Sequence, residues 1–143
     1  MTVKGYKIFD GDGHVLESDD ELAQYFEGDY KGGQRVTGLG IFPSLDGWSR
    51  GPMLRSEDAN RKYWHTNADI WSECLEMIGA EGSVLYPTAA LAHGLMRDTN
   101  FATATAIAYN NWLEDLYTKK DNRLFGAGCT PIQDPAAGAR EVR

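Results

Sequence analysis

Apolar and polar positions along the chain follow two different periods, which predict strands that alternate with helices. Three short apolar runs have the length of buried strands: 6–9, 83–86 and 123–130. Two longer stretches carry apolar residues at helical spacing: 67–78 and 99–119. Asp134 and Pro135 have the N-cap and first-turn chemistry of a further helix that continues to Arg143. This alternation predicts an α/β protein with a parallel sheet and crossover helices.

Capping residues predict where these helices begin and end. Ser18, followed three residues later by Glu21, forms a capping box for a short helix after the first strand. Gly79 can close the helix over 67–78. Asp98 or Thr99 can cap the long helix that follows. The capping signals and the apolar spacing therefore predict the same elements.

The segment from 28 to 66 follows neither pattern, because glycine and charged residues are frequent in it. Residues 35–37 and 39–42 could pair as a small hairpin. A stretch of this length without clear elements is usually functional or mobile. We expect either an excursion on the rim of a barrel or a surface insertion without a role in the site.

The number of elements bears on the architecture. A parallel sheet must be covered on both faces or closed into a barrel. The sequence holds about three βα units, whereas a TIM barrel uses eight and typically roughly 250 residues. We therefore expect residues 1–143 to form the N-terminal part of a (β/α)8 TIM barrel, as one domain with the rim excursion at 28–66. The alternative is a small open α/β domain.

Composition argues against several classes of protein. Lys and Arg number 14 against 21 Asp and Glu, and a net charge of −7 disfavours binding to phosphate backbones. No apolar run approaches the roughly 20 residues that span a bilayer, and the N-terminus lacks the apolar core of a signal peptide. Cys74 and Cys129 show neither framework nor CxxC spacing, so we expect buried apolar residues. These features predict a cytoplasmic protein that binds neither nucleic acid nor membrane.

The residues whose side chains are best suited to metal binding or catalysis follow the first predicted strand, in the run Asp10-Gly11-Asp12-Gly13-His14. Because alternate residues of a strand face the same side, Asp12 and His14 are expected to point together, with Asp10 behind them. A carboxylate beside an imidazole can hold a divalent cation. The C-terminal end of a barrel strand is also where active sites of this fold are built. The run therefore predicts part of a metal site.

Two other interpretations of this run remain open from the local pattern. In a calcium loop of the EF-hand type, Asp10, Asp12 and Glu21 would occupy ligand positions, but Val15 stands where glycine is needed and a strand precedes. In a plain turn rich in glycine and aspartate, His14 would be incidental. A signal of three residues is too short to decide between a site and a turn.

Four stretches, in order along the chain, resemble the amidohydrolase-related branch of the amidohydrolase superfamily. This branch includes aminocarboxymuconate-semialdehyde decarboxylase and related aromatic acid decarboxylases. The run 8–17, IFDGDGHVLE, looks like the metal motif of the family's first strand. The other similar stretches are 75–82 with 84–88, the "AYN-W" helix at 108–113, and 122–126 with 131–135. Together they cover most of the chain outside 28–66.

The resemblance implies a metal-dependent hydrolase or decarboxylase that acts on a small carboxylated or cyclic substrate through a metal-activated water or substrate oxygen. Asp12 and His14 stand at the two positions where the family usually has metal-binding histidines. The aspartate is compatible with Zn²⁺ or Mn²⁺. The family's remaining metal ligands and catalytic residues come from later strands, so we expect them beyond Arg143. The resemblance also implies a homo-oligomer for the complete protein, whereas the chain by itself should be inactive and bind metal poorly.

Three further residues are weaker candidates. Glu17 is either a site carboxylate or a partner for a helix dipole. His93 and Arg97 would sit on the rim near the substrate, or make ordinary polar contacts in a loop. One rival hypothesis is a non-catalytic α/β module that binds a partner through its open sheet edge, and another is a metal-free hydrolase of the same fold. Convergence of Asp12 and His14 at the end of the strand would favour the metalloenzyme over the module.

Overall fold

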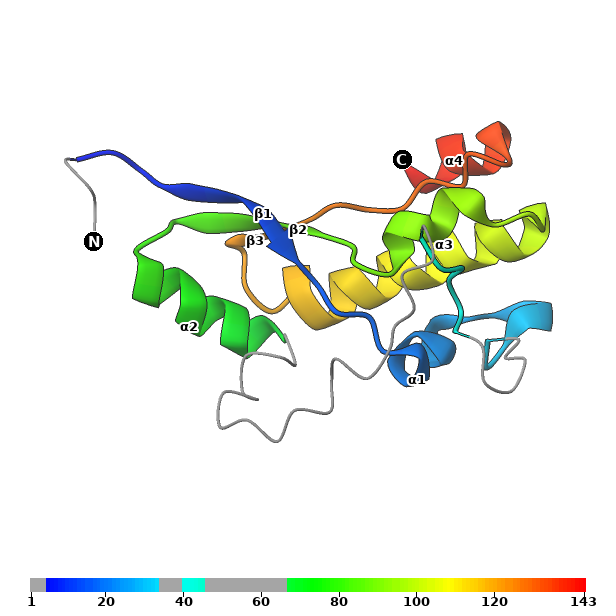
Figure 1. Cartoon of the computed structure of the whole chain (residues 1–143), viewed down its shortest axis with the longest axis horizontal. Coiled ribbons are helices and arrows are strands. Elements are labelled where there is room, and N and C mark those ends of the chain that lie inside the picture. Colours follow the sequence, from blue (N-terminus) through cyan, green and yellow to red (C-terminus); the bar gives the residue numbers. More distant parts are fainter. Residues whose placement is uncertain (1–4, 34–39, 46–66) are drawn as a thin grey trace.

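Three parallel strands form a sheet in the order β1-β2-β3 (Figure 1). The structure is a computed structural model, and it describes residues 5–33, 40–45 and 67–143. The strands are β1 (Phe9–His14), β2 (Gly82–Tyr86) and β3 (Leu124–Gly126). The α-helices are α1 (Asp19–Leu22), α2 (Ala68–Ile78), α3 (Thr99–Leu113) and α4 (Pro135–Glu141). A π-helical turn, η6 (Glu114–Thr118), extends α3, and the 3₁₀ turns are η1 (Ala23–Tyr25), η2 (Gly28–Tyr30) and η5 (Ala90–Leu95). The predicted alternation and the parallel sheet are confirmed.

Local hydrogen bonds cap the helices, as predicted at Gly79 and Asp98, and the structure adds a cap at Asn67. The Asn67 side chain accepts a hydrogen bond from the N–H of Ile70 at the start of α2, and Gly79 ends that helix with a φ of 70°. The Asp98 side chain accepts from the N–H of Phe101 at the start of α3. Local hydrogen bonds therefore fix these boundaries, which explains why they could be predicted from short motifs.

Three predicted elements differ from the structure. The predicted first strand ended at Phe9, whereas β1 begins there and continues through the Asp-Gly run to His14, because this run pairs with β2. The third strand is confined to Leu124–Gly126 rather than 123–130. Of the suggested hairpin, residues 34–39 lie outside the described residues, and Ile41 and Phe42 are buried in a bend rather than in a strand.

Helices α2 and α3 pack on one face of the sheet, which we call the helix face (Figure 1). In the sheet, Leu85 lies between Gly13 and Gly126 and is fully buried. A Cβ at Gly13 would lie 2.9 Å from the Trp71 ring on α2, and a Cβ at Gly126 would lie 2.7 Å from Leu113 on α3. The two glycines thus let both helices approach the sheet closely.

The opposite face of the sheet, which we call the open face, carries aromatic side chains that remain largely accessible. Phe9, Tyr86 and Phe125 are 57%, 39% and 49% exposed. The rings of Phe9 and Phe125 approach to 6.5 Å across Gly82, where a Cβ would lie within about 3 Å of both rings. The described residues therefore cover this face of the sheet less than the helix face.

The core centres on Trp112, whose side chain is fully buried. Its ring contacts those of Tyr109 and Tyr117 at centroid distances of 5.8 and 5.3 Å. Its Nε1 donates to the Glu21 carboxylate at 3.0 Å, which joins α3 to α1. The predicted capping box is formed on the Ser18 side, where Oγ accepts from the N–H of Glu21 at 3.5 Å. The Glu21 side chain accepts the hydrogen bond from Trp112.

A charged cluster ties α2 to the start of β3. The Asp121 carboxylate accepts hydrogen bonds from the Arg123 guanidinium at 2.6 Å and from Ser72 Oγ of α2 at 2.6 Å. The Arg123 guanidinium also lies 3.8 Å from the Glu76 carboxylate. The hydrogen bonds from Arg123, and after them the one from Ser72, hold the pKa of Asp121 well below its ordinary value of 3.8.

This cluster should make stability depend on pH. Because the pKa of Asp121 is lower in the folded chain, its contribution is present above about pH 4 and is lost as the pH falls. Urea unfolding at pH 7 and pH 3 should show that Asp121→Asn removes about 1 kcal/mol of the wild-type pH dependence, allowing for screening at the partly exposed guanidinium. Asp29→Asn, at an exposed position, is the control. Identical pH dependence in all three proteins would refute this assignment.

Candidate functional site

A β-bulge determines where the side chains of the Asp-Gly run point. Asp10 pairs with Ser83 and Gly13 pairs with Leu85, so β1 uses one more residue than β2 over this interval. Gly13 consequently faces the helix face, beneath Trp71. The next residue, His14, then lies on the open face. The expected simple alternation is therefore interrupted within the motif itself.

Asp12 and His14 lie together at the end of β1. Their closest polar atoms, Asp12 Oδ1 and His14 Nε2, are 4.0 Å apart. The Asp12 side chain is 94% exposed and that of His14 is 40% exposed. His14 pairs with Tyr86 of β2, and the two rings are 6.1 Å apart. The spacing predicted that the two side chains would share a side, and they do.

The alternation predicted that Asp10 would lie behind this pair, but in the structure it does not. Its Oδ2 accepts a hydrogen bond from Ser83 Oγ at 2.7 Å, and its Oδ1 accepts from the N–H of Asp12 at 3.2 Å. A Cβ at Gly13 would lie 2.4 Å from the same Ser83 Oγ, which places that hydroxyl on the helix face. The bulge thus separates Asp10 from Asp12 and His14, and this part of the prediction is wrong.

The ring of His14 is oriented by the loop after β2. His14 Nδ1 lies 2.9 Å from the carbonyl oxygen of Pro87 and 3.3 Å from Thr88 Oγ1. Because a carbonyl oxygen can only accept, Nδ1 must carry the proton in this contact. The lone pair of the neutral ring is then on Nε2, the atom that faces Asp12. Metal-binding histidines are commonly oriented in this way.

The donor set fits one half of a metal site. A carboxylate oxygen and an imidazole nitrogen are suitable ligands for Zn²⁺ or Mn²⁺. Two ligands at metal distances of about 2.0–2.2 Å lie roughly 3–3.5 Å from each other, so a small rotation of the exposed Asp12 side chain would suffice. Within residues 5–33, 40–45 and 67–143, however, no three His, Cys, Asp or Glu side chains form a group that could hold a metal.

Glu17 stabilises the loop that orients His14. Its carboxylate accepts hydrogen bonds from the N–H groups of Thr88, Ala89 and Ala90 at 3.1, 2.9 and 2.9 Å. These groups lie at the start of η5, where free N–H groups favour a negative charge. Of the two interpretations of Glu17, the helix-dipole partner agrees with the structure.

His93 and Arg97 have different environments. His93 is only 4% exposed, and its Nε2 donates to the carbonyl oxygen of Ala102 at 2.8 Å. The carbonyl oxygen of His93 in turn accepts from Gln133 Nε2 at 3.1 Å. These contacts give His93 a structural role, in agreement with the alternative of an ordinary polar contact. Arg97 is exposed between η5 and α3.

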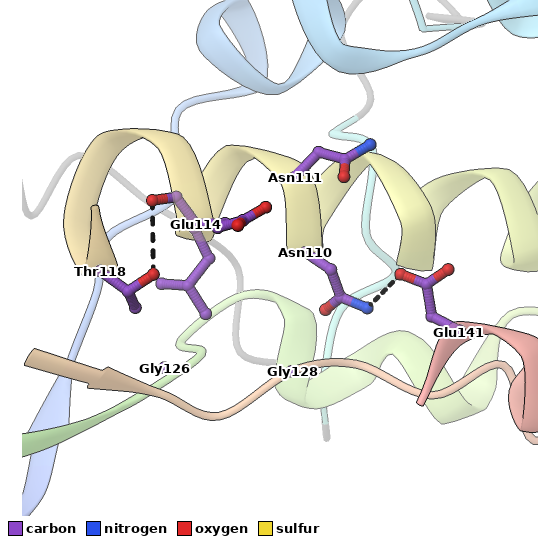
Figure 2. Close-up of a pocket in the computed structure, with 8 residues that line it drawn as sticks. Asn110, Asn111, Glu114, Thr118, Gly126, Gly128 and Glu141 are labelled. Carbon is purple, nitrogen blue, oxygen red and sulfur yellow. Dashed lines mark hydrogen bonds between the residues drawn. The ribbon is translucent and has the colours of Figure 1, made fainter. Parts of the chain in front are cut away.

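Asn110, in the "AYN-W" helix, holds the chain that leaves β3. Its Oδ1 accepts from the N–H of Cys129 at 2.7 Å, and its Nδ2 donates to the Cys129 carbonyl oxygen at 2.9 Å. The same Nδ2 donates to Glu141 of α4 at 2.8 Å (Figure 2). Burial, followed by the nearby Glu17 carboxylate, raises the pKa of the Cys129 thiol to about 12. Asn110 and Cys129 therefore serve packing rather than chemistry. The predicted burial of Cys129 is confirmed, whereas Cys74 is only partly buried.

The pocket in Figure 2 is separate from the candidate site. Its volume is about 400 Å³. It is lined by Asn110, Asn111, Leu113, Glu114, Thr118, Gly126, Gly128 and Glu141. It lies along β3 on the helix face, because Gly126 faces Leu113 and Thr118. Asp12 and His14 lie on β1 at the opposite edge of the sheet. The hollow therefore belongs to the exposed edge of β3.

Comparison with known proteins shows the fold alone. No family model and no curated protein matches the sequence. The structure is similar to the crystal structure of amidohydrolase map2389c from Mycobacterium avium subsp. paratuberculosis K-10, with a TM-score of 0.64 and 19% sequence identity. The match covers 96% of this chain and 45% of that one, so this chain spans less than half of its length. In the described part of this chain, no helix has the length and apolar character to cross a membrane.

The bulge and its hydrogen bonds were not foreseen from the sequence. Ser83 looked like an ordinary residue of a buried strand, and only the sheet register brings it to Asp10. The available signal was the pair of glycines on either side of Asp12, since glycine within a strand often marks a bulge. Pro87 and Thr88 gave no local sign of a contact with His14.

Proposed function

We propose that this chain forms the first part of a metal-dependent (β/α)8-barrel enzyme of the amidohydrolase superfamily, in its amidohydrolase-related branch. The observation that carries the proposal is the convergence of Asp12 and His14 on the open face at the C-terminal end of β1. Active sites of barrel enzymes are built at this end of the strands. The similarity in fold to part of an amidohydrolase supports the barrel architecture.

In the proposed site, Asp12 and His14 hold a Zn²⁺ or Mn²⁺ ion. The proton on His14 Nδ1, donated to Pro87, leaves Nε2 free as the ligand atom. When bound, the cation supplies Lewis-acid polarisation of a water molecule or a substrate oxygen. The remaining ligands and the acid–base group would come from the rest of the barrel. We infer a hydrolase or decarboxylase in a cytoplasmic homo-oligomer.

The substrate class follows from the same family likeness. We infer a small carboxylated or cyclic substrate that enters over the open face, where the rings of Phe9, Tyr86 and Phe125 are accessible. The exposed guanidinium of Arg97 would suit a substrate carboxylate. We do not include His93 in this site, because its ring is buried against Ala102.

A non-catalytic interaction module is the second candidate, and the exposed aromatic face favours it, because such a surface can bind a partner. That hypothesis does not explain why Asp12 Oδ1 and His14 Nε2 lie only 4.0 Å apart on one side of the strand. The two functions differ in whether the protein retains a metal through these two residues.

Metal content tests the proposal. The complete gene product, purified without chelators, should contain about one Zn²⁺ or Mn²⁺ per chain. Asp12→Ala and His14→Ala should each weaken metal binding at least tenfold, because each removes a ligand. Asp29→Ala, at an exposed position outside the site, is the matched control. Unchanged metal content in both site variants would favour the interaction module or a metal-free enzyme.

A further inference from the structure

We propose that Asp10 and Ser83 are positioning residues whose hydrogen bond maintains the bulge in β1 and thereby turns Asp12 and His14 onto the open face. This inference rests on the proposed function, since it assumes that these two side chains hold a cation. It goes further by assigning a task to two residues that do not touch the cation.

The bulge changes the face on which the pair lies. Phe9 lies on the open face, where its ring contacts that of Phe125. In a regular strand, alternation from Phe9 would put Asp10, Asp12 and His14 all on the helix face. The extra residue between Asp10 and Gly13 reverses the alternation, so that Gly13 meets the helix face and His14 the open face. A register change of one residue moves every later side chain to the other face.

The helix face has no room for a metal site at this point. A Cβ at Gly13 would already lie 2.4 Å from Ser83 Oγ, 2.9 Å from the Trp71 ring and 3.0 Å from Leu85. Leu85 and Ser83 are fully buried there. The pair can therefore reach a substrate only if the bulge is maintained.

Asp10 provides the hydrogen bonds that stabilise this irregular backbone. A bulge leaves a backbone group of the extra residue without a partner in the sheet. Here the N–H of Asp12 donates to Asp10 Oδ1 at 3.2 Å. The other carboxylate oxygen is fixed by the buried Ser83 hydroxyl at 2.7 Å. Ser83 thus holds Asp10, and Asp10 holds the backbone at Asp12.

Paramagnetic broadening by MnCl₂ tests this arrangement in the chain of 143 residues. Paramagnetic broadening falls steeply with distance from the ion, so manganese should broaden the ring signals of His14 at lower concentrations than those of His93, whose buried ring donates to the carbonyl oxygen of Ala102. Ser83→Ala should raise the Mn²⁺ concentration needed for half-maximal broadening about tenfold, as expected when a supporting residue of a metal site is lost. Nuclear Overhauser effects between His14 and Tyr86, which pair across β1 and β2, report the register without metal and should weaken in the same variant.

Ser72→Ala is the matched control. Ser72 also donates to an aspartate, Asp121, at 2.6 Å, but its hydrogen bond joins α2 to the start of β3 and not to β1. Its loss should leave the broadening of His14 and the contact with Tyr86 unchanged. If Ser83→Ala does not fold, Asp10→Ala and Asp10→Asn give the same test. Asparagine can accept from the N–H of Asp12 and donate to the Ser83 hydroxyl, so it should retain most of the effect that alanine loses.

The outcomes separate the two proposals. If wild-type His14 is broadened selectively and Ser83→Ala behaves like Ser72→Ala, the positioning role is refuted and the metal pair stands. If wild-type His14 shows no selective broadening even at millimolar MnCl₂, where a weak site with two ligands is partly occupied, the metal pair is refuted. In that case the contact between His14 and Tyr86 still tests the positioning role, and its persistence in Ser83→Ala and Asp10→Ala would overturn it.

Discussion

Replacing Trp112 with alanine should lower the free energy of unfolding by about 3–5 kcal/mol, the usual cost of removing a buried tryptophan side chain. Trp112 is fully buried between Tyr109 and Tyr117, and its Nε1 donates to Glu21 at 3.0 Å. The variant therefore creates a cavity and also removes a hydrogen bond between α3 and α1. Urea unfolding followed by circular dichroism measures the change.

Trp112→Phe is the matched control for the cavity. It keeps an aromatic ring in the core but loses the Nε1 donor, so its destabilisation should be markedly smaller, with about 1 kcal/mol from the lost hydrogen bond. Equal destabilisation by alanine and phenylalanine would show that the hydrogen bond to Glu21, and not the packing of the ring, dominates. A loss below about 1 kcal/mol for alanine would contradict the central place of Trp112 in the core.

Replacing Gly13 with alanine should cost about 3 kcal/mol or more, although it adds a single methyl group. The new Cβ would lie 2.4 Å from Ser83 Oγ and 2.9 Å from the Trp71 ring. Overpacking of a core costs about 1–3 kcal/mol, and displacement of the Ser83 hydroxyl would also break its charge-assisted hydrogen bond to Asp10. Urea unfolding gives the stability, and the contact between His14 and Tyr86 shows whether the bulge survives.

Gly11→Ala is the control for this substitution. Gly11 lies two residues earlier in the same strand, and a Cβ there would have no neighbour within 4 Å. Its replacement should change the free energy of unfolding by less than about 1 kcal/mol. Similar losses for the two variants would mean that backbone freedom in the motif, rather than the close approach at Gly13, is what the fold requires.

Local signals in the sequence were sufficient for the order of the elements and for the helix ends. A cap such as Asp98 acts within one turn, and its hydrogen bond to the N–H of Phe101 depends on little else. The apolar spacing of the long helix likewise reflects the face that packs on the sheet. These features could be predicted because their partners lie nearby in the sequence.

The orientation of the site depends on contacts that are distant in the sequence. Regular alternation predicted that Asp10, Asp12 and His14 would all face one way. The register between β1 and β2 inserts a bulge, and its hydrogen bond joins Asp10 to Ser83, 73 residues away. Such register shifts depend on pairing with another strand, which a single strand's pattern does not contain.

The weaker candidates were decided by packing. Glu17 and His93 both carry polar groups that could serve a site, and their sequence context gave no reason to prefer one use. In the fold, the N–H groups at the start of η5 surround Glu17, and a helix carbonyl meets the ring of His93. The buried ring of His93 requires such a partner, whereas the half-buried Glu17 is assigned by the free N–H groups that donate to it.

The most direct measurement is the position of a bound metal. Crystals of the chain are soaked in MnCl₂ at a concentration high enough to load a weak site with two ligands. Anomalous scattering should then show a peak about 2.0–2.2 Å from both His14 Nε2 and an Asp12 carboxylate oxygen, on the same side of the sheet as the Tyr86 ring. Metal bound at other carboxylates with none at this pair, or side chains of Asp12 and His14 on opposite faces of the sheet, would contradict the proposed metal centre.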